Sequence, residues 1–209
     1  MNPEYFLKTA VSALLLLCAS CAGLAQALAP NVNPDPTALK AGNYVLDHKH
    51  AALVFKVDHL GFSNYVGRFN RFDVSLDFDE TDPAAARVEA VIDMTSLDIA
   101  NDEFANVLMG PSWFDANQFP EAILRSTGIE ITGDNTGVMT GDLTMHGVTH
   151  PVTINVTFNG GGNDRLRGAY IIGMSASATI DRNDFGVDRY GGIVGDMVEI
   201  AIEAEFERQ

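Results

Sequence analysis

From residue 42 to the end of the chain, apolar and polar side chains alternate with a period of two. The clearest run, near the C-terminus, sets Val198, Ile200, Ile202, Ala204 and Phe206 against Glu199, Glu203 and Glu205. Residues 87–94, 152–158 and 174–180 repeat the pattern. Successive side chains of a strand point to opposite faces, so each of these runs predicts a strand with one buried face.

Shorter segments also have strand composition, and clusters of Gly, Asn, Asp and Pro separate them. These segments are residues 43–47, 51–60, 66–78, 122–127, 128–132 and 138–145. Residues 133–137 and 146–149 have the composition of hairpin turns. A single helix is expected over residues 101–109, because Asp102 and Glu103 favour its first turn and Gly110-Pro111 ends it. The sequence therefore predicts a nearly all-β chain with one short helix in a connecting loop.

Alternation alone is compatible with a sandwich or with a closed barrel. Two observations favour a hollow barrel. Small residues occupy several positions expected to face inward, namely Ala90, Gly141, Ala176, Ala178 and Ala204. Phe69 and Phe72 break the alternation within residues 66–78, as a bulge that curls the sheet would do. We expect an extended antiparallel barrel of about eight strands, with a filled core as the alternative.

The first residues are typical of an export signal. An apolar run at residues 9–17 is shorter than the ~20 residues that span a bilayer, and small residues allow cleavage after Ala27 or Ala29. We expect a signal peptide over residues 1–29, a flexible linker over 30–41, a barrel domain over 42–209 and a periplasmic location. Lipid modification at Cys21 is the minor alternative.

Charge and cysteine content narrow the function classes. The formal net charge is −15, which argues against nucleic acid and anionic membrane surfaces as partners, because both require a basic patch. Both cysteines, Cys18 and Cys21, lie in the expected leader, so the mature chain would have neither a disulfide nor a cysteine nucleophile.

Catalytic motifs are scarce in the sequence. After the expected leader no Gly-x-Ser-x-Gly elbow, phosphate loop or zinc-ligand cysteine pair occurs, and residues 77–82 lack the spacing of a calcium loop. His48 and His50 are two residues apart, and His59 could approach them from the next strand. A metal-dependent periplasmic enzyme built on these three histidines is therefore one alternative function. Arg182 and Asp184 are expected to form a buried pair that pins the barrel end, or to meet a ligand head group.

Several longer motifs occur in a distinctive order. They are Tyr44-Val45-Leu46-Asp47 with His50, residues 54–63, Gly67-Arg68-Phe69, Ser112-Trp113-Phe114-Asp115, Phe119-Pro120, residues 141–149, residues 182–187 and Val194-Gly195-Asp196. Together they resemble the YceI-like family of bacterial polyisoprenoid-binding proteins. The resemblance implies a lipocalin-like periplasmic barrel that binds and carries or stores a polyprenyl chain or an isoprenoid quinone. We expect no enzymatic activity, no catalytic residue, no metal and no cofactor besides the bound lipid; a filled-barrel interaction module is the other alternative.

The expected ligand-binding residues fall into three groups. Candidates for the wall of the lumen are Phe55, Val57, Phe72, Leu76, Val88, Ile92, Leu143, Ile154, Met174, Ala176, Ile180, Ile200 and Ala204. Candidates for an aromatic mouth are Phe62, Phe104, Leu108, Trp113, Phe114 and Phe119. Polar contacts are expected from His50, His59, His146, Arg182 and Asp184.

One segment departs from the family pattern. Where similar proteins often carry charged Arg-Asp and His-Leu-Arg sequences, this chain has Glu103-Phe104 and Val107-Leu108-Met109. This chain therefore lacks the charged residues that would contact a polar head group at the helix. Besides the lipid, we expect no nucleic acid partner and at most a transient contact with a membrane or a membrane protein.

Overall fold

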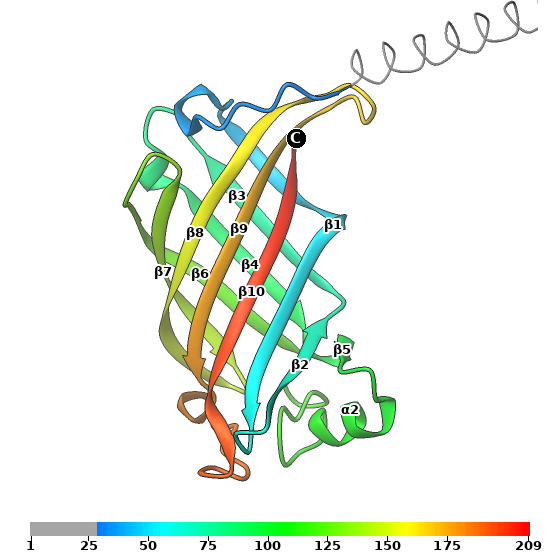
Figure 1. The fold of residues 1–209 in the computed structure, drawn as a ribbon. Coiled ribbons are helices and arrows are strands. Elements are labelled where there is room, and N and C mark those ends of the chain that lie inside the picture. Colours follow the sequence, from blue (N-terminus) through cyan, green and yellow to red (C-terminus); the bar gives the residue numbers. More distant parts are fainter. Residues whose placement is uncertain (1–28) are drawn as a thin grey trace, which may run out of the picture.

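The computed structural model describes residues 29–209. Almost all of the expected signal peptide, and both cysteines, lie outside these residues. The described chain forms ten strands and one α-helix, α2 (Asp102–Leu108), as Figure 1 shows. The strands are β1 (Gly42–His59), β2 (Ser63–Phe69), β3 (Phe72–Phe78), β4 (Arg87–Asp93), β5 (Leu97–Asp98), β6 (Glu121–Ile131), β7 (Thr136–Met145), β8 (Val148–Asp164), β9 (Ala169–Asp181) and β10 (Val194–Arg208).

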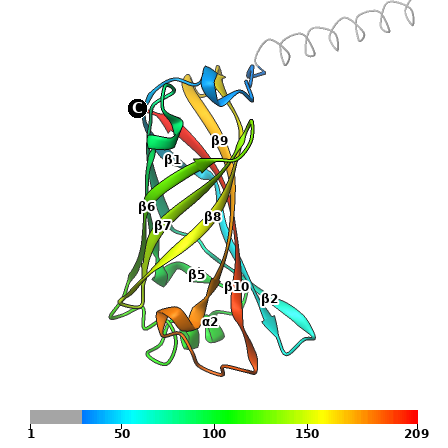
Figure 2. The same ribbon diagram turned by 90° about the vertical axis from the view of Figure 1, so that its left-hand side faces the viewer.

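The strands close into an antiparallel barrel. Eight of them, β1, β3, β4, β6, β7, β8, β9 and β10, form the wall, and β10 pairs back with β1 to complete it (Figures 1 and 2). The closing pair runs from Tyr44 opposite Arg208 to His59 opposite Val194. The predicted barrel of about eight strands, with one short helix, is confirmed. We call the end that carries α2 in Figure 1 the lower end, and the opposite end the upper end.

The alternation pattern placed one irregularity wrongly. Residues 66–78 are not one bulged strand: Asn70 and Arg71 leave the ladder between β2 and β3, and the backbone N–H of Asn70 bonds to the carbonyl of Ser96 instead. The register shifts elsewhere, in β1 between Leu46 and Ala51, which we call the β1 bulge, and between Val57 and His59, and in β8 between Phe158 and Gly160. The two strands expected over 43–47 and 51–60 are the two halves of β1. The two expected over 122–132 are likewise the single strand β6, whose register shifts between Ser126 and Gly128.

The helix forms where its capping residues indicated. The side chain of Asn101 accepts a hydrogen bond from the backbone N–H of Phe104 at 3.0 Å, and the acidic residues of the first turn favour the positive end of the helix dipole. It ends at Leu108, shortly before Gly110. Ala105 and Leu108 are buried, so α2 packs its inner face on the lower end of the barrel. No helix of the described residues is long and apolar enough to cross a membrane.

Residues 31–39, which we call the N-terminal strap, lie against β8 at the upper end of the barrel (Figure 2). Asn33 and Gly161 exchange two backbone hydrogen bonds of 2.8 and 2.9 Å. Leu39 is buried, and three consecutive glycines on β8, at residues 160–162, leave the space that the strap fills. The strap lies within the linker expected over residues 30–41, and the missing side chains of these glycines let it approach the backbone of β8.

Candidate functional site

The inward face of the barrel is only partly buried. On β10, Val198, Ile200 and Ile202 point toward the barrel axis yet keep part of their surface accessible, while the residues between them face solvent. In a filled barrel these inward side chains would pack against one another and lose their accessible surface. The lumen is therefore hollow along this strand, in contrast to the filled-core alternative.

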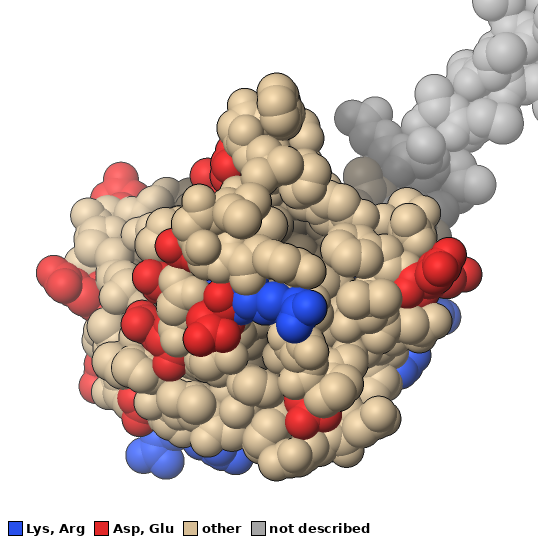
Figure 3. Space-filling view, turned by 90° about the horizontal axis from the view of Figure 1, so that it is seen from below, with Lys and Arg blue, Asp and Glu red and all other residues tan. Residues whose placement is uncertain are grey.

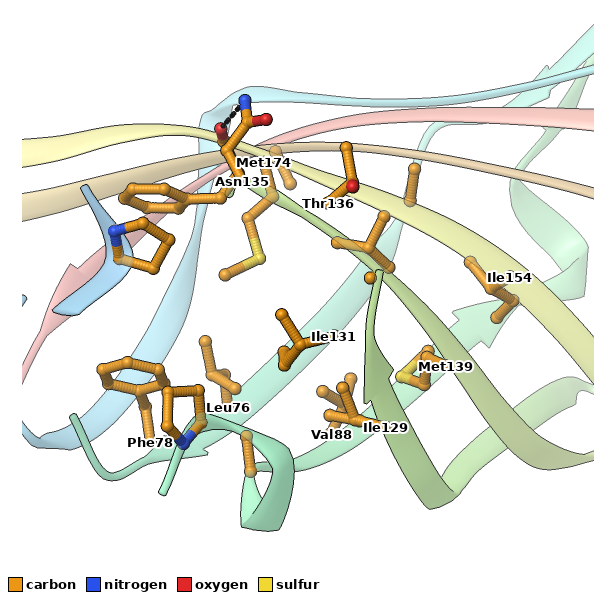
Figure 4. A pocket seen from close by; sticks show the side chains of 18 of the residues that line it. Leu76, Phe78, Val88, Ile129, Ile131, Asn135, Thr136, Met139, Ile154 and Met174 are labelled. Atoms are coloured by element: carbon orange, nitrogen blue, oxygen red, sulfur yellow. Dashed lines mark hydrogen bonds between the residues drawn. The ribbon is translucent and has the colours of Figure 1, made fainter. Parts of the chain in front are cut away.

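The upper part of the lumen is an apolar cavity of about 260 Å³. Its wall consists of aliphatic, aromatic and methionine side chains from seven strands. Figure 4 shows several of these side chains pointing into a shared space. The strap, the β3–β4 connection and the β6–β7 turn surround its upper end. The amide of Asn135 in this turn donates a 3.1 Å hydrogen bond to the carbonyl of Phe158, drawn as a dashed line. One of the two N–H groups of this amide is thus engaged, and the rest of the wall is mainly apolar.

The lower part of the lumen is a second cavity, of about 290 Å³. Leu53, Phe55 and Val57 of β1 form one side of it, and Ile180 and Ile200 form another. Aromatic residues gather around its lower end. The rings of Tyr65 and Phe104 lie 5.8 Å apart, those of Phe69 and Phe114 6.1 Å apart, and those of Trp113 and Tyr190 6.0 Å apart, between centroids. These edge-on and tilted ring pairs give the lower cavity a wall rich in aromatic side chains.

Several inward side chains lie between the two cavities and line neither of them, among them the lumen candidates Phe72, Ile92 and Leu143. Phe72 on β3 is opposite Ile92 on β4. The neighbouring inward pair on these two strands is Val74 opposite Ala90, and both of those residues line the upper cavity. Leu143 on β7 is buried between residues of the upper and lower cavities. These three apolar residues form a constriction of the lumen, between its upper and lower cavities.

Most lumen candidates from the sequence lie on a cavity wall. Those at the upper cavity are Leu76, Val88, Ile154, Met174, Ala176 and Ala204. Those at the lower cavity are Phe55, Val57, Ile180 and Ile200. Phe72, Ile92 and Leu143 form the constriction instead.

The expected mouth is only partly assembled. Phe104, Leu108, Trp113 and Phe114 line the lower cavity. Phe62 does not: it lies at the tip of the β1–β2 hairpin, 88% exposed, because the turn through Leu60 and Gly61 points it away from the barrel. Phe119 is also off the wall, since its ring packs against that of His146 at 5.0 Å.

Arg182 lies in the wall of the lower cavity, but its polar groups are used within the protein. Its guanidinium donates to the carbonyls of Val187, Arg189, Val194 and Gly195 and to the carboxylate of Asp196. All five N–H groups of the side chain are thereby engaged. This geometry supports a structural role for Arg182, in which it pins the barrel end.

The predicted partner of Arg182 was wrong. Asp184 is exposed and makes no ion pair with it; Asp196 does, at 3.2 Å. The reason is local: Asp184 lies within the turn of 3-10 helix over Arg182–Phe185, whereas Asp196 lies at the start of β10, beside the guanidinium. Arg182 therefore has no free donor for a ligand head group, and Asp184 lines neither cavity.

The histidines are dispersed. His48, His50 and His59 all lie on β1, not on neighbouring strands. His50 and His59 are nine positions apart, about 30 Å at the rise of a strand. His48 lies 3.7 Å from Asp73 and His59 lines the lower cavity. The three cannot share a metal ion, so the metal centre proposed for them is wrong.

The other two histidines with an expected ligand role are held by the protein itself. His146 is within 3.1 Å of the carbonyl of Phe185, through its Nδ1. His50 lies outside the lumen, at the β1 bulge, with its Nδ1 2.7 Å from the carboxylate of Asp47. Only His59 of the expected histidine contacts lies on a cavity wall.

A charged cluster surrounds His50. The ligand atoms of Asp47, His50 and Glu205 lie within 4.8 Å of one another. Arg167 already supplies a positive charge there, with 2.8 Å to Asp47, 2.7 Å to Asp164 and 2.7 Å to Glu205. The hydrogen bond from the His50 ring, followed by those from the backbone and Arg167, outweighs partial burial and lowers the pKa of Asp47. The cluster joins the β8–β9 turn to the β1 bulge and to β10.

Some wall residues were not identified from the sequence. Tyr65 shares the inward side of β2 with Gly67 and Phe69, and a strand started at residue 63 would have revealed it. Tyr190 comes from the loop before β10 and has no such periodic signal. Pro36, Thr37 and Pro83 at the upper cavity were also not identified, because apolar and polar residues do not alternate in loops as they do in strands.

Comparison with protein families identifies the fold. Residues 44–206 match the model of the YceI-like domain. The chain therefore belongs to the YceI-like family. YceI-like relatives include a UPF0312 protein of Vibrio parahaemolyticus, 38% identical over 170 residues, which are 80% of this chain and 89% of the relative. A UPF0312 protein of Pseudomonas aeruginosa is 37% identical over 171 residues, 81% of this chain and 88% of the relative.

Solved structures show the same YceI-like architecture. BcnA from Burkholderia cenocepacia superposes with a TM-score of 0.69 at 25% identity, over 77% of this chain and 98% of BcnA. A YceI protein of Campylobacter jejuni gives a TM-score of 0.63 at 25% identity, over 74% and 91%. A polyisoprenoid binding domain from Saccharophagus degradans gives 0.60 at 15% identity, over 81% and 100%. At that last identity the likeness shows the fold alone.

Proposed function

We propose that the protein binds and carries or stores a long isoprenoid lipid, either a polyprenyl chain or an isoprenoid quinone, in the periplasm. The observation that carries the proposal is the hollow lumen, in which two apolar cavities follow one another inside a single barrel. Membership of the YceI-like family and the fold shared with a polyisoprenoid binding domain support the class of ligand. The expected export signal at residues 1–29 supports the location.

The dimensions of the lumen suit a long chain. A strand of ~10 residues rises ~3.3 Å per residue, about 30 Å in all, which is close to the hydrocarbon thickness of a bilayer. Each buried methylene contributes roughly 0.8 kcal/mol relative to water. A membrane offers the lipid an equally apolar surrounding, and ordering a flexible chain costs entropy, so exchange between protein and membrane is near balance. A carrier or a reservoir requires that balance.

Binding, not chemistry, is the activity that the cavity walls favour. Their side chains are nearly all apolar, and Arg182 has each of its donors engaged. General acid–base catalysis needs a titratable group held beside a reacting atom in a site that tunes its pKa. The carboxylate at the upper cavity belongs to Asp134, which is exposed on the β6–β7 turn.

The decisive experiment is to extract the purified protein with organic solvent and to identify the extract by mass spectrometry. A stoichiometric isoprenoid lipid is the expected result. The apoprotein should then take up an added polyprenol or isoprenoid quinone. An extract without any long-chain lipid, together with no uptake of either compound, would overturn the proposal. Fractionation of the source cells, with detection of the protein, tests the periplasmic location separately.

A further inference from the structure

We infer that the lower end of the barrel docks on a lipid bilayer of neutral head groups, through a rim of exposed apolar side chains around the lower cavity. The inference rests on the proposed function, since it names the place where the lipid enters and leaves. The rim consists of Leu60, Phe62, Phe104, Val107, Tyr190 and Ile193, all of them exposed.

Three separate segments contribute to the rim. Leu60 and Phe62 form the tip of the β1–β2 hairpin, which projects beyond the barrel wall in Figure 2. Tyr190 and Ile193 belong to the loop between β9 and β10, and Phe104 and Val107 to α2. Strand pairing brings the first two segments together, because His59 is opposite Val194. The rim is thus one region of the surface, not scattered single residues.

The rim is continuous with the lower cavity. Phe104 and Tyr190 are exposed on their outer sides and also line the cavity. Their rings contact Tyr65 and Trp113, which lie deeper in the same wall. Apolar surface therefore extends without interruption from solvent into the lumen. An isoprenoid chain that leaves a bilayer along this path would not have to expose its length to water.

The charge pattern selects the kind of surface. The protein carries a net charge of −15, yet residues 59–67 and 190–195 contain no Asp, Glu, Lys or Arg. Figure 3, which views the lower end, shows a face where uncharged atoms predominate, with most acidic residues toward one side, a few at the other edges and a basic residue near the middle. Acidic neighbours repel anionic lipid, and uncharged apolar segments insert into an interface without transferring a charge. A zwitterionic or uncharged lipid surface is complementary to this end of the barrel.

Exposure of Phe62 is fixed by the hairpin turn. Leu60 and Gly61 both have positive φ, 61° and 72°. The backbone N–H of Phe62 donates to the carbonyl of His59 at 3.1 Å, and that of Gly61 donates to the carboxylate of Asp58 at 3.0 Å. The turn thereby presents a large apolar ring to the exterior at a defined position. Exposed aromatic and aliphatic residues clustered in this way mark interaction sites.

The test is flotation of the purified full chain with phosphatidylcholine vesicles, comparing the wild type with a Phe62→Ser/Ile193→Ser double variant. The matched control is Leu166→Ser, which removes an apolar side chain of 73% exposure at the upper end. All three proteins share the same N-terminus, so any contribution of residues 1–28 cancels. We expect the double variant to bind at least about tenfold more weakly, because two apolar side chains no longer leave water. The control should bind like the wild type.

Further arms separate the possible outcomes. Vesicles containing phosphatidylglycerol should bind no better than neutral ones, and salt should have little effect. Unchanged flotation of the double variant, or an equal loss in Leu166→Ser, would overturn the docking surface. A change from dimer to monomer in sedimentation of the double variant would also overturn it, since the occupant would then be a second copy of this chain.

Uptake of a polyprenol from detergent, without any vesicle, tests the proposed function independently of docking. Equal uptake by all three proteins, with transfer from vesicles slowed about tenfold in the double variant alone, supports both proposals. No uptake by the wild type, together with loss of vesicle binding in the double variant, would overturn the lipid carrier and leave the docking surface supported. Equal transfer rates in all three proteins would remove the rim from the path of the lipid.

Discussion

Leu39 packs directly on the backbone of Gly161. A Cβ added to this glycine would lie 2.5 Å from Cδ2 of Leu39 and 3.0 Å from Cγ2 of Ile172. The close approach holds the strap over the upper cavity, where Leu39 is both buried and part of the wall. The contact therefore connects a single glycine of β8 with the closure of one end of the lumen.

Gly161→Ala should displace the strap. The added methyl group and Leu39 cannot occupy the same space, and exposing a buried leucine costs about 2 kcal/mol of unfolding free energy. Urea denaturation measures the loss, and hydrogen exchange of the backbone amide at position 161 should be faster in the variant as its bond to Asn33 breaks. Gly173→Ala is the control, since its nearest neighbour would lie at 3.7 Å. Similar effects of the two substitutions would contradict the role given to the strap.

Ala204→Phe should plug the lumen. Ala204 lies on the wall of the upper cavity, opposite Met174 of β9, and a ring there would occupy space that the lipid needs. Ala201→Phe places the same ring on the exposed outer side of the same strand. We expect uptake of a polyprenol to fall about tenfold or more in the first variant and to stay unchanged in the second. Fluorescence titration measures both; equal uptake would remove Ala204 from the binding site.

Phe72→Val should widen the constriction. A valine leaves space between the two cavities, at a cost of about 2 kcal/mol in stability. Long polyprenols that extend through both cavities should gain affinity relative to short ones. The control, Phe185→Val, removes a buried ring that belongs to the 3-10 helix over Arg182–Phe185 and not to the wall between the cavities. An identical preference for chain length in the two variants, measured by competition, would show that Phe72 does not divide the lumen.

Arg182→Lys should weaken the fold without weakening lipid binding. An ammonium group cannot replace the fork of donors that satisfies the surrounding carbonyls, so several buried acceptors lose their partners. We expect a loss of about 3 kcal/mol in unfolding free energy. At a temperature where both proteins are folded, polyprenol uptake should be equal. Lost uptake with unchanged stability would instead assign Arg182 to a ligand head group.

Asp47→Asn should alter the dependence of stability on pH. Since the folded state lowers the pKa of Asp47 below its ordinary 3.8, the carboxylate stabilises the fold fully above that value. This stabilisation disappears as the pH falls through the lowered pKa. The variant should be less stable by about 1 kcal/mol at neutral pH, with the partial exposure of the cluster considered. The difference should vanish in strong acid. Thermal denaturation of the wild type and the variant over a range of pH measures this difference.

The fold was predictable because the alternation of apolar and polar residues within each strand indicates which of its faces is buried. Val198, Ile200 and Ile202 indicated the inner face of β10 without any knowledge of its neighbours. The same pattern could not distinguish a break from a bulge at Phe69 and Phe72, since both invert the alternation. That distinction depends on Asn70 and Arg71 bonding to a distant loop segment.

The candidate site was predictable only where strands form it. Leu76, Ala176 and Ile200 face the lumen because of their parity. The loop residues Pro36 and Tyr190 reach it because the chain folds back over the barrel ends, which leaves no periodic trace. Positions of polar side chains were the least predictable. The choice of Asp196 over Asp184 by Arg182 depends on backbone geometry that the sequence order does not reveal.

Closure of the barrel by β1 and β10 has a consequence for how the chain folds. These strands are the first and last of the domain, so their pairing has the greatest separation along the sequence. Until they meet, each has an unpaired edge at which another chain can add and aggregate. The outer face of β10 carries Glu199, Glu203, Glu205 and Glu207. Two such edges from different molecules would set glutamate against glutamate, whereas β1 offers Lys56 opposite Glu199. The acidic row thus acts as a gatekeeper, favouring ring closure within one chain over pairing between chains.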